Sequence, residues 1–147
     1  MVDGERAMIG SVYINVYKIK EIDILDKVIS EILWTHKRLI VCLDSNSRSL
    51  QWDPSCIHKK SSSPVREMGD RFEKLCLSHS LNVLNNGQLT YYNWEFSSAV
   101  DITITHGIEH IGPVKWQVID DFLQTPHKGI IIEAGKKEKH KKTKIID

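Results

Sequence analysis

Two runs of β-branched residues flank a helical pattern in the first third of the chain, and this arrangement constrains the fold most. The stretch "IGSVYINV" (9–16) has the composition of a strand, and "RLIVCLD" (38–44) reads as a second, buried strand. Between them, apolar residues recur at three- and four-residue steps that place them on one helix face: Ile19, Ile22, Leu25, Val28, Ile29, Ile32 and Leu33. A strand, a helix and a strand in succession predict a parallel crossover in an α/β protein with layered sheets.

The rest of the chain continues as a loop, a second helix and a series of strands. Residues 46–64 lack periodicity and read as a long loop. A second amphipathic helix is predicted to end near His79, with its apolar face formed by Val65, Met68, Phe72, Leu75 and Cys76. Five further stretches predict strands: "LNVL" (81–84), "LTYYN" (89–93), "AVDITIT" (99–105), "KWQVID" (115–120) and "GIIIEA" (129–134).

Composition limits the size and number of domains. With 147 residues, of which 41% are apolar, the chain is long enough for one domain with a buried core. We expect a polar lead over residues 1–8, a domain over 9–133 and a lysine-rich tail over 134–147. Within the tail, "KKEKHKKTK" (136–144) carries six lysines and one glutamate. This run either contacts nucleic-acid phosphates or is a solvated or nuclear-targeting segment, and both readings stay open.

The cysteines and the short apolar runs indicate the cellular compartment. Cys42, Cys56 and Cys76 form no CxxC pair, and their odd number favours a reducing, intracellular environment. Cys76 and His79 have the spacing of zinc ligands, but no second such pair accompanies them, so a zinc site is not expected. No apolar run is long enough to span a bilayer, so we expect no membrane partner.

Polar residues near the predicted strands are the candidate site. Asp44 and Asn46 follow a buried strand, and residues two apart in an extended segment point the same way. The aspartate could accept a proton while the asparagine amide holds an oxygen, although a simple capped turn has the same residue types. Asp101 interrupts a run of β-branched residues, and a carboxylate buried there needs a hydrogen-bond donor. The imidazole of His127 is the candidate donor. Alternatively, Asp101 bonds backbone amides and His127 lies in a solvated turn.

Four segments, by their amino-acid sequences and their order along the chain, resemble a known protein family. They are "LDSNSRSLQW" (43–52), "RFEKLCLSHSLNVLNNGQLTYY" (71–92), "SSAVDITIT" (97–105) and "WQVIDDFLQTPHKGI" (116–130). They resemble successive motifs of the endonuclease/exonuclease/phosphatase family, in particular the apurinic-like endonuclease domain of non-LTR (LINE-type) retrotransposons. The resemblance covers roughly residues 9–133.

This resemblance implies a two-sheet α/β sandwich, a magnesium ion and hydrolytic nicking of DNA to prime reverse transcription. By motif, Asp44 would handle a proton and Asn46 would hold an oxygen on the phosphate side. Asp101 would partner His127, and His127 would contact the scissile phosphate.

Departures from the family pattern change these expectations. Leu43 replaces the glycine of the G-D-x-N element, and Pro126 stands where the S-D-H element has an aspartate beside the metal. The family's opening strands, which bear a metal-binding glutamate, lie upstream of the point where this sequence starts. We therefore expect a partial fold lacking its opening strands, weak or absent magnesium binding, no assigned metal ligands and impaired catalysis. The alternatives are a non-catalytic remnant that binds nucleic acid or self-associates through an exposed sheet edge, and a decayed reading frame without a role.

Overall fold

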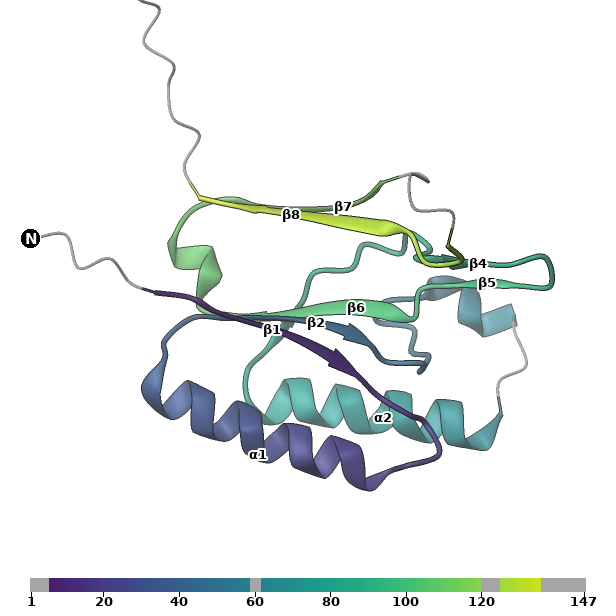
Figure 1. The fold of residues 1–147 in the computed structure, drawn as a ribbon, viewed down its shortest axis with the longest axis horizontal. Coiled ribbons are helices and arrows are strands. Elements are labelled where there is room, and N and C mark those ends of the chain that lie inside the picture. Colours follow the sequence, from purple (N-terminus) through teal and green to yellow (C-terminus); the bar gives the residue numbers. More distant parts are fainter. Residues whose placement is uncertain (1–5, 59–61, 120–124, 136–147) are drawn as a thin grey trace, which may run out of the picture.

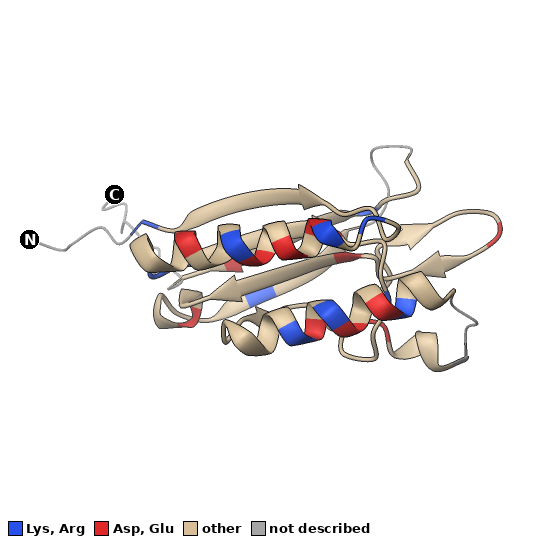
Figure 2. Cartoon of the chain, turned by 90° about the horizontal axis from the view of Figure 1, so that it is seen from below, with Lys and Arg blue, Asp and Glu red and all other residues tan. Residues whose placement is uncertain are grey.

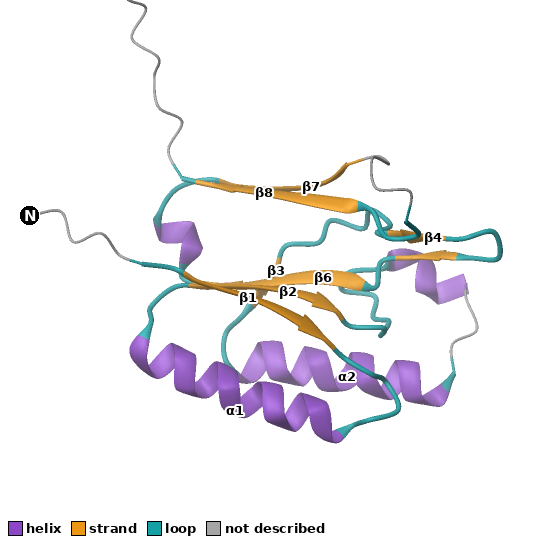
Figure 3. Cartoon of the chain, viewed as in Figure 1, coloured by secondary structure: helices purple, strands orange, loops and turns teal. Residues whose placement is uncertain are grey.

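A computed structural model describes residues 6–58, 62–119 and 125–135 and shows three layers (Figures 1 and 3). Two α-helices cover one side of a four-stranded sheet, and a two-stranded ribbon lies over the other side. The strands and α-helices are β1 (Met8–Tyr13), α1 (Lys20–Thr35), β2 (Leu39–Asp44), α2 (Ser63–Ser78), β3 (Asn82–Val83), β4 (Tyr91–Tyr92), β5 (Ser97–Ser98), β6 (Asp101–His106), β7 (Val114–Ile119) and β8 (Gly129–Ala134). Short 3-10 helices span Pro54–His58 and Ile108–His110.

The strand order confirms the predicted crossover. The main sheet has the order β1-β2-β6-β3, with β1 and β2 parallel and the remaining pairs antiparallel. Helix α1 therefore connects two parallel neighbours, as the strand, helix, strand pattern predicts. Strands β7 and β8 form the antiparallel ribbon, and β4 pairs with β5 in a small separate sheet. The predicted α/β class with layered sheets is confirmed.

The core lies between the helices and one face of the main sheet. Side chains alternate along β2, so Leu39, Val41 and Leu43 are buried against the helices while Cys42 and Asp44 face the other way. Helix α2 adds Phe72 to the same core, where it is fully buried. Each such burial stabilises the fold by roughly 1.5–3 kcal/mol.

The opposite face of the sheet carries polar groups toward the ribbon. Trp116 of β7 is buried and donates its Nε1–H to Thr103 Oγ1 of β6 at 3.0 Å. Because side chains alternate, Asp101 lies on the same face of β6 as Thr103, whereas Ile102 belongs to the helix-side core. The space between the sheet and the ribbon is therefore where polar residues at strand ends meet.

The outer surfaces of the helices mix both signs of charge (Figure 2). His79, the C-cap residue of α2, has its Nε2 2.5 Å from Asp26 Oδ1, and Arg71 Nη1 of α2 lies 3.9 Å from Asp23 Oδ1. A hydrogen bond and an ion pair therefore link α2 and its C-cap to α1. A nucleic acid needs a surface of predominantly positive charge, which this helical side does not present.

Several sequence-based expectations need correction in detail. The first strand ends at Tyr13 instead of continuing to residue 16, and the predicted strand 89–93 shortens to Tyr91–Tyr92. The loop predicted for 46–64 is partly structured, because it contains a 3-10 helix and α2 already begins at Ser63. Pro64 lies in the first turn of α2, where its missing N–H has no intrahelical partner to lose.

The sequence-based expectations also concern the cysteines, membrane-spanning segments and the lysine run. Among the described residues, Cys42, Cys56 and Cys76 form no disulfide, and Cys42 is only half-buried. In the part of the chain that the structure describes, no helix has the length and apolarity needed to cross a membrane. The lysine run 136–144 lies outside the described residues.

Candidate functional site

The two aspartates predicted from the sequence end neighbouring strands at the same edge of the sheet. Asp44 is the last residue of β2, Asp101 is the first of β6, and the antiparallel register places them directly opposite each other. Both side chains are on the face toward the ribbon. Like charges directly opposite in a sheet repel each other, so this pair requires a proton or a cation nearby.

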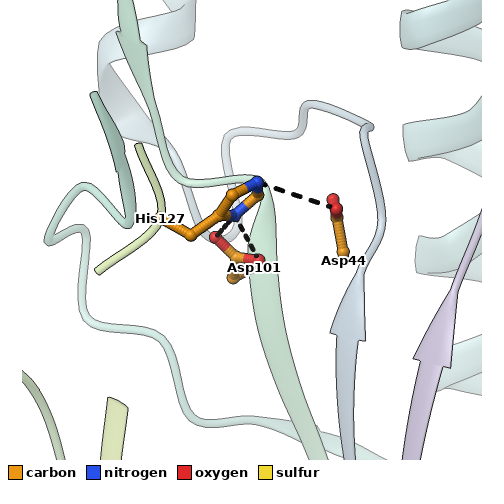
Figure 4. A group of neighbouring side chains, drawn as sticks. All are labelled: Asp44, Asp101 and His127. Carbon is orange, nitrogen blue, oxygen red and sulfur yellow. Dashed lines mark hydrogen bonds and ion pairs between the residues drawn. The ribbon is translucent and has the colours of Figure 1, made fainter. Parts of the chain in front are cut away.

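His127 lies between the two carboxylates (Figure 4). Its Nδ1 is 3.1 and 3.0 Å from the two carboxylate oxygens of Asp101, and its Nε2 is 3.9 Å from Asp44 Oδ2. Because an ionised carboxylate can only accept, Nδ1–H donates to Asp101, and in the neutral ring Nε2 is the basic nitrogen that faces Asp44. The predicted contact between Asp101 and His127 is therefore present, while the catalytic role of these residues stays a prediction.

The short segment that carries His127 is held by β4. Tyr91 and His127 form an antiparallel bridge, and the N–H of Tyr92 donates to the carbonyl of Pro126 at 2.8 Å. The rings of Tyr91 and His127 meet edge to face, with centroids 4.9 Å apart. Backbone pairing and ring packing thus orient the imidazole from outside the main sheet.

Asp44 has a perturbed protonation equilibrium. Burial raises the pKa of Asp44 above its ordinary value, and the negative charge of Asp101 raises this pKa further. His127 and the backbone N–H of Asn46 act in the opposite direction. Oδ1 of Asp44 is buried and has no hydrogen-bond partner among the described residues. This carboxyl group is therefore suited to holding or accepting a proton.

Asn46 is placed differently from the sequence-based expectation. Its backbone φ is 48°, which is a left-handed conformation, so the extended segment assumed for residues 44–46 is wrong at this position. Its side-chain Nδ2–H donates to the carbonyl of Ile14 at 3.2 Å, which ties the end of β2 to the segment after β1. A role for Asn46 in binding an oxygen stays a prediction.

A cleft of about 540 Å³ opens beside these residues. Asp44 and Asp101 line it, with Tyr13 of β1, with Lys128 directly before β8 and with Ile130 of β8. We call this space the carboxylate cleft. It gives a ligand access to both aspartates from the face of the sheet that the helices do not cover.

An aromatic hairpin projects from the same end of the molecule (Figure 1). It consists of β4, β5 and the turn between them, and the turn carries Trp94, which is 92% exposed. The ring of Phe96 stacks on the ring of Tyr91, with centroids 5.4 Å apart. We call residues 91–98 the aromatic hairpin. The sequence-based prediction missed this feature and Lys128, although "YYNWEF" (91–96) and the lysine after His127 were available as signals.

Asp44, Asp101 and His127 also form a group that could hold a metal ion. Each offers one ligand atom, and these atoms all lie within 4.8 Å of one another. Two carboxylates and an imidazole differ from the all-oxygen sets that magnesium prefers.

Comparisons with known proteins agree with this architecture. Residues 7–131 match the protein family described as endonuclease-reverse transcriptase. Among solved structures, the endonuclease domain of TRAS1, a telomere-specific non-LTR retrotransposon, is similar with a TM-score of 0.67 and 19% sequence identity. The alignment covers 86% of this chain and 56% of that chain, so the present chain spans little more than half the length of that domain. No curated protein matches. At this identity the structural likeness shows a shared fold.

Proposed function

This chain belongs to the endonuclease-reverse transcriptase family, and on that premise we propose that Asp44, Asp101 and His127 form the proton-transfer centre of a retrotransposon-type endonuclease domain. The domain binds DNA and, as this chain stands, cleaves its phosphodiester bonds poorly. One observation carries the proposal: a single imidazole is bonded to Asp101 through Nδ1 and faces Asp44 through Nε2.

The chemistry follows from this arrangement. Asp44 accepts a proton from the attacking water, a role to which its raised pKa is suited. The water oxygen bonds to phosphorus as the P–O bond to one sugar oxygen breaks, and the leaving oxygen takes a proton from solvent. Asp101 orients His127, whose outer nitrogen contacts a phosphate oxygen and, when protonated, stabilises the charge that develops there. Asn46 holds an oxygen on the phosphate side once its amide is released from the Ile14 carbonyl.

Magnesium, which the family resemblance implies, fits this donor set poorly. Nδ1 of His127 and the carboxylate of Asp101 already bond to each other, and imidazole is a weak ligand for this hard cation. Pro126 supplies no side-chain ligand, and its carbonyl accepts the N–H of Tyr92. We therefore expect weak magnesium binding and low activity, and we assign no step to the metal.

The aromatic hairpin supports DNA as the substrate. The hairpin exposes three aromatic rings on which bases can stack: those of Tyr92, Trp94 and Phe96. Such stacking contributes roughly 1–3 kcal/mol per base to the free energy of binding. The lysine run 136–144 would add salt-sensitive phosphate contacts. These groups could act without cleavage, so a purely DNA-binding role is the second candidate.

Nicking of a supercoiled plasmid tests the catalytic part of the proposal. With magnesium or manganese, we expect nicking by this chain to stay close to background, and Asp44→Ala to remove what remains. Asp70→Ala is the matched control, because Asp70 is an exposed carboxylate on α2. Pro126→Asp alone should raise the rate by less than about tenfold, since one added carboxylate does not complete an octahedral site.

Two results would change the conclusion. Efficient magnesium-dependent nicking that Asp44→Ala abolishes would show that the chain is a working endonuclease. Failure to bind any DNA at low salt, measured by fluorescence anisotropy, would contradict the assignment of DNA as the substrate.

A further inference from the structure

We propose that Lys128 is a phosphate-binding residue of the carboxylate cleft and gives the cleft an affinity for DNA that needs no metal ion. This inference rests on the DNA-binding part of the proposed function. It adds a positively charged residue to a site whose aspartates and histidine alone do not account for anion binding.

The position of Lys128 is fixed by its backbone. Its N–H donates to the carbonyl of Thr90 at 2.7 Å, beside the bridge between Tyr91 and His127. Lys128 and Ile130 are two residues apart, and both line the carboxylate cleft. The backbone of Lys128 is therefore held in place next to β8, and its side chain forms part of the cleft wall.

The ammonium group connects the cleft to the aromatic hairpin. Nζ of Lys128 lies 5.3 Å from the centroid of the Tyr92 ring, a cation–π contact, while the same side chain lines the cleft with Asp44 and Asp101. A DNA strand whose bases stack on the exposed rings would bring its backbone phosphates to this lysine.

The charge balance of the site explains why a cation is needed. Asp44 and Asp101 repel a phosphodiester when both are ionised, and a protonated His127 offsets only one of them. Lys128 supplies the second positive charge. An ammonium is a compact charge with three donors, which suits a phosphate oxygen and imposes little directional constraint.

Binding of a short duplex oligonucleotide in EDTA, followed by fluorescence anisotropy across a salt series, tests the inference. We expect Lys128→Gln to weaken binding roughly fivefold near 0.1 M salt and to reduce the salt slope by about 1. Lys128→Arg should bind like the unmodified chain. Lys115→Gln is the matched control, because Lys115 lies on β7 with a 64% exposed side chain and pairs with Glu133 at 3.6 Å.

The outcomes separate this inference from the proposed function. Equal losses for Lys128→Gln and Lys115→Gln would overturn it, because net charge alone would then explain binding. Binding that appears only with added manganese would also overturn it but leave DNA as the substrate. No binding under either condition would overturn both. Thermal melts confirm folding, and Lys128→Met provides a second neutral variant if Lys128→Gln does not fold.

Discussion

At the scale of single residues, the raised pKa of Asp44 couples the candidate site to folding stability. Burial and then the charge of Asp101 raise this pKa above the ordinary value of 3.8. The protonated form is thus favoured in the folded state, and the stability that this preference contributes is complete below pH 3.8. It is lost as the pH rises through the folded pKa. We expect Asp44→Asn to melt at a higher temperature than the unmodified chain at pH 7, with a difference that disappears below pH 3.8.

A matched substitution separates this effect from a general change of charge. Asp70→Asn removes an exposed carboxylate on α2 and should change the melting temperature little at any pH. A stabilisation by Asp44→Asn that is equally large at pH 3 and pH 7 would show that the ionisation of the Asp44 carboxyl group is not its cause.

At the scale of elements, Gly69 determines how closely α2 approaches the loop that follows β2. A Cβ at Gly69 would lie 2.1 Å from the carbonyl oxygen of Arg48, a distance that atoms do not tolerate. We expect Gly69→Ala to destabilise the fold by about 2 kcal/mol, because the steric clash exceeds the helix propensity that alanine gains. Urea denaturation measures the change. The exposed α2 variant Lys74→Ala should stay within about 0.5 kcal/mol, and similar stability of both variants would contradict a tight contact here.

The elements also show what the sequence can and cannot predict. The helix around Phe72 follows from apolar spacing, because its burial pattern repeats with the helical period. The contact between Asp101 and His127 follows from the need of a half-buried carboxylate for a donor. The conformation of Asn46 does not follow, since it depends on a carbonyl 32 residues away in sequence. Pairing of Tyr91 with His127 is equally nonlocal, so neither the aromatic hairpin nor Lys128 was assigned to the site.

At the scale of the whole molecule, β1 leaves one side of the main sheet unpaired among the described residues. The N–H groups of Met8 and Ile14 donate to the carbonyls of Arg38 and Asp44, both at 2.9 Å. Hydrogen-bonding direction alternates along a strand, so the N–H and C=O groups of residues 9, 11 and 13 point away from β2. The sequence "MIGSVY" (8–13) contains no charge or proline, which are the usual means of protecting an edge.

This edge predicts concentration-dependent self-association. Ile9 and Tyr13 are 70% and 66% exposed and lie at equal distances in sequence from Ser11. Two copies can therefore pair β1 antiparallel about Ser11, with each Ile9 opposite a Tyr13, and satisfy both edges. Analytical ultracentrifugation should show association that Tyr13→Lys weakens at least about tenfold, because a lysine pair disfavours edge pairing. Tyr17→Lys is the control, since Tyr17 is 77% exposed but lies outside the strand. A monomer at all concentrations, or equal effects of the two substitutions, would show that β1 is not the interface.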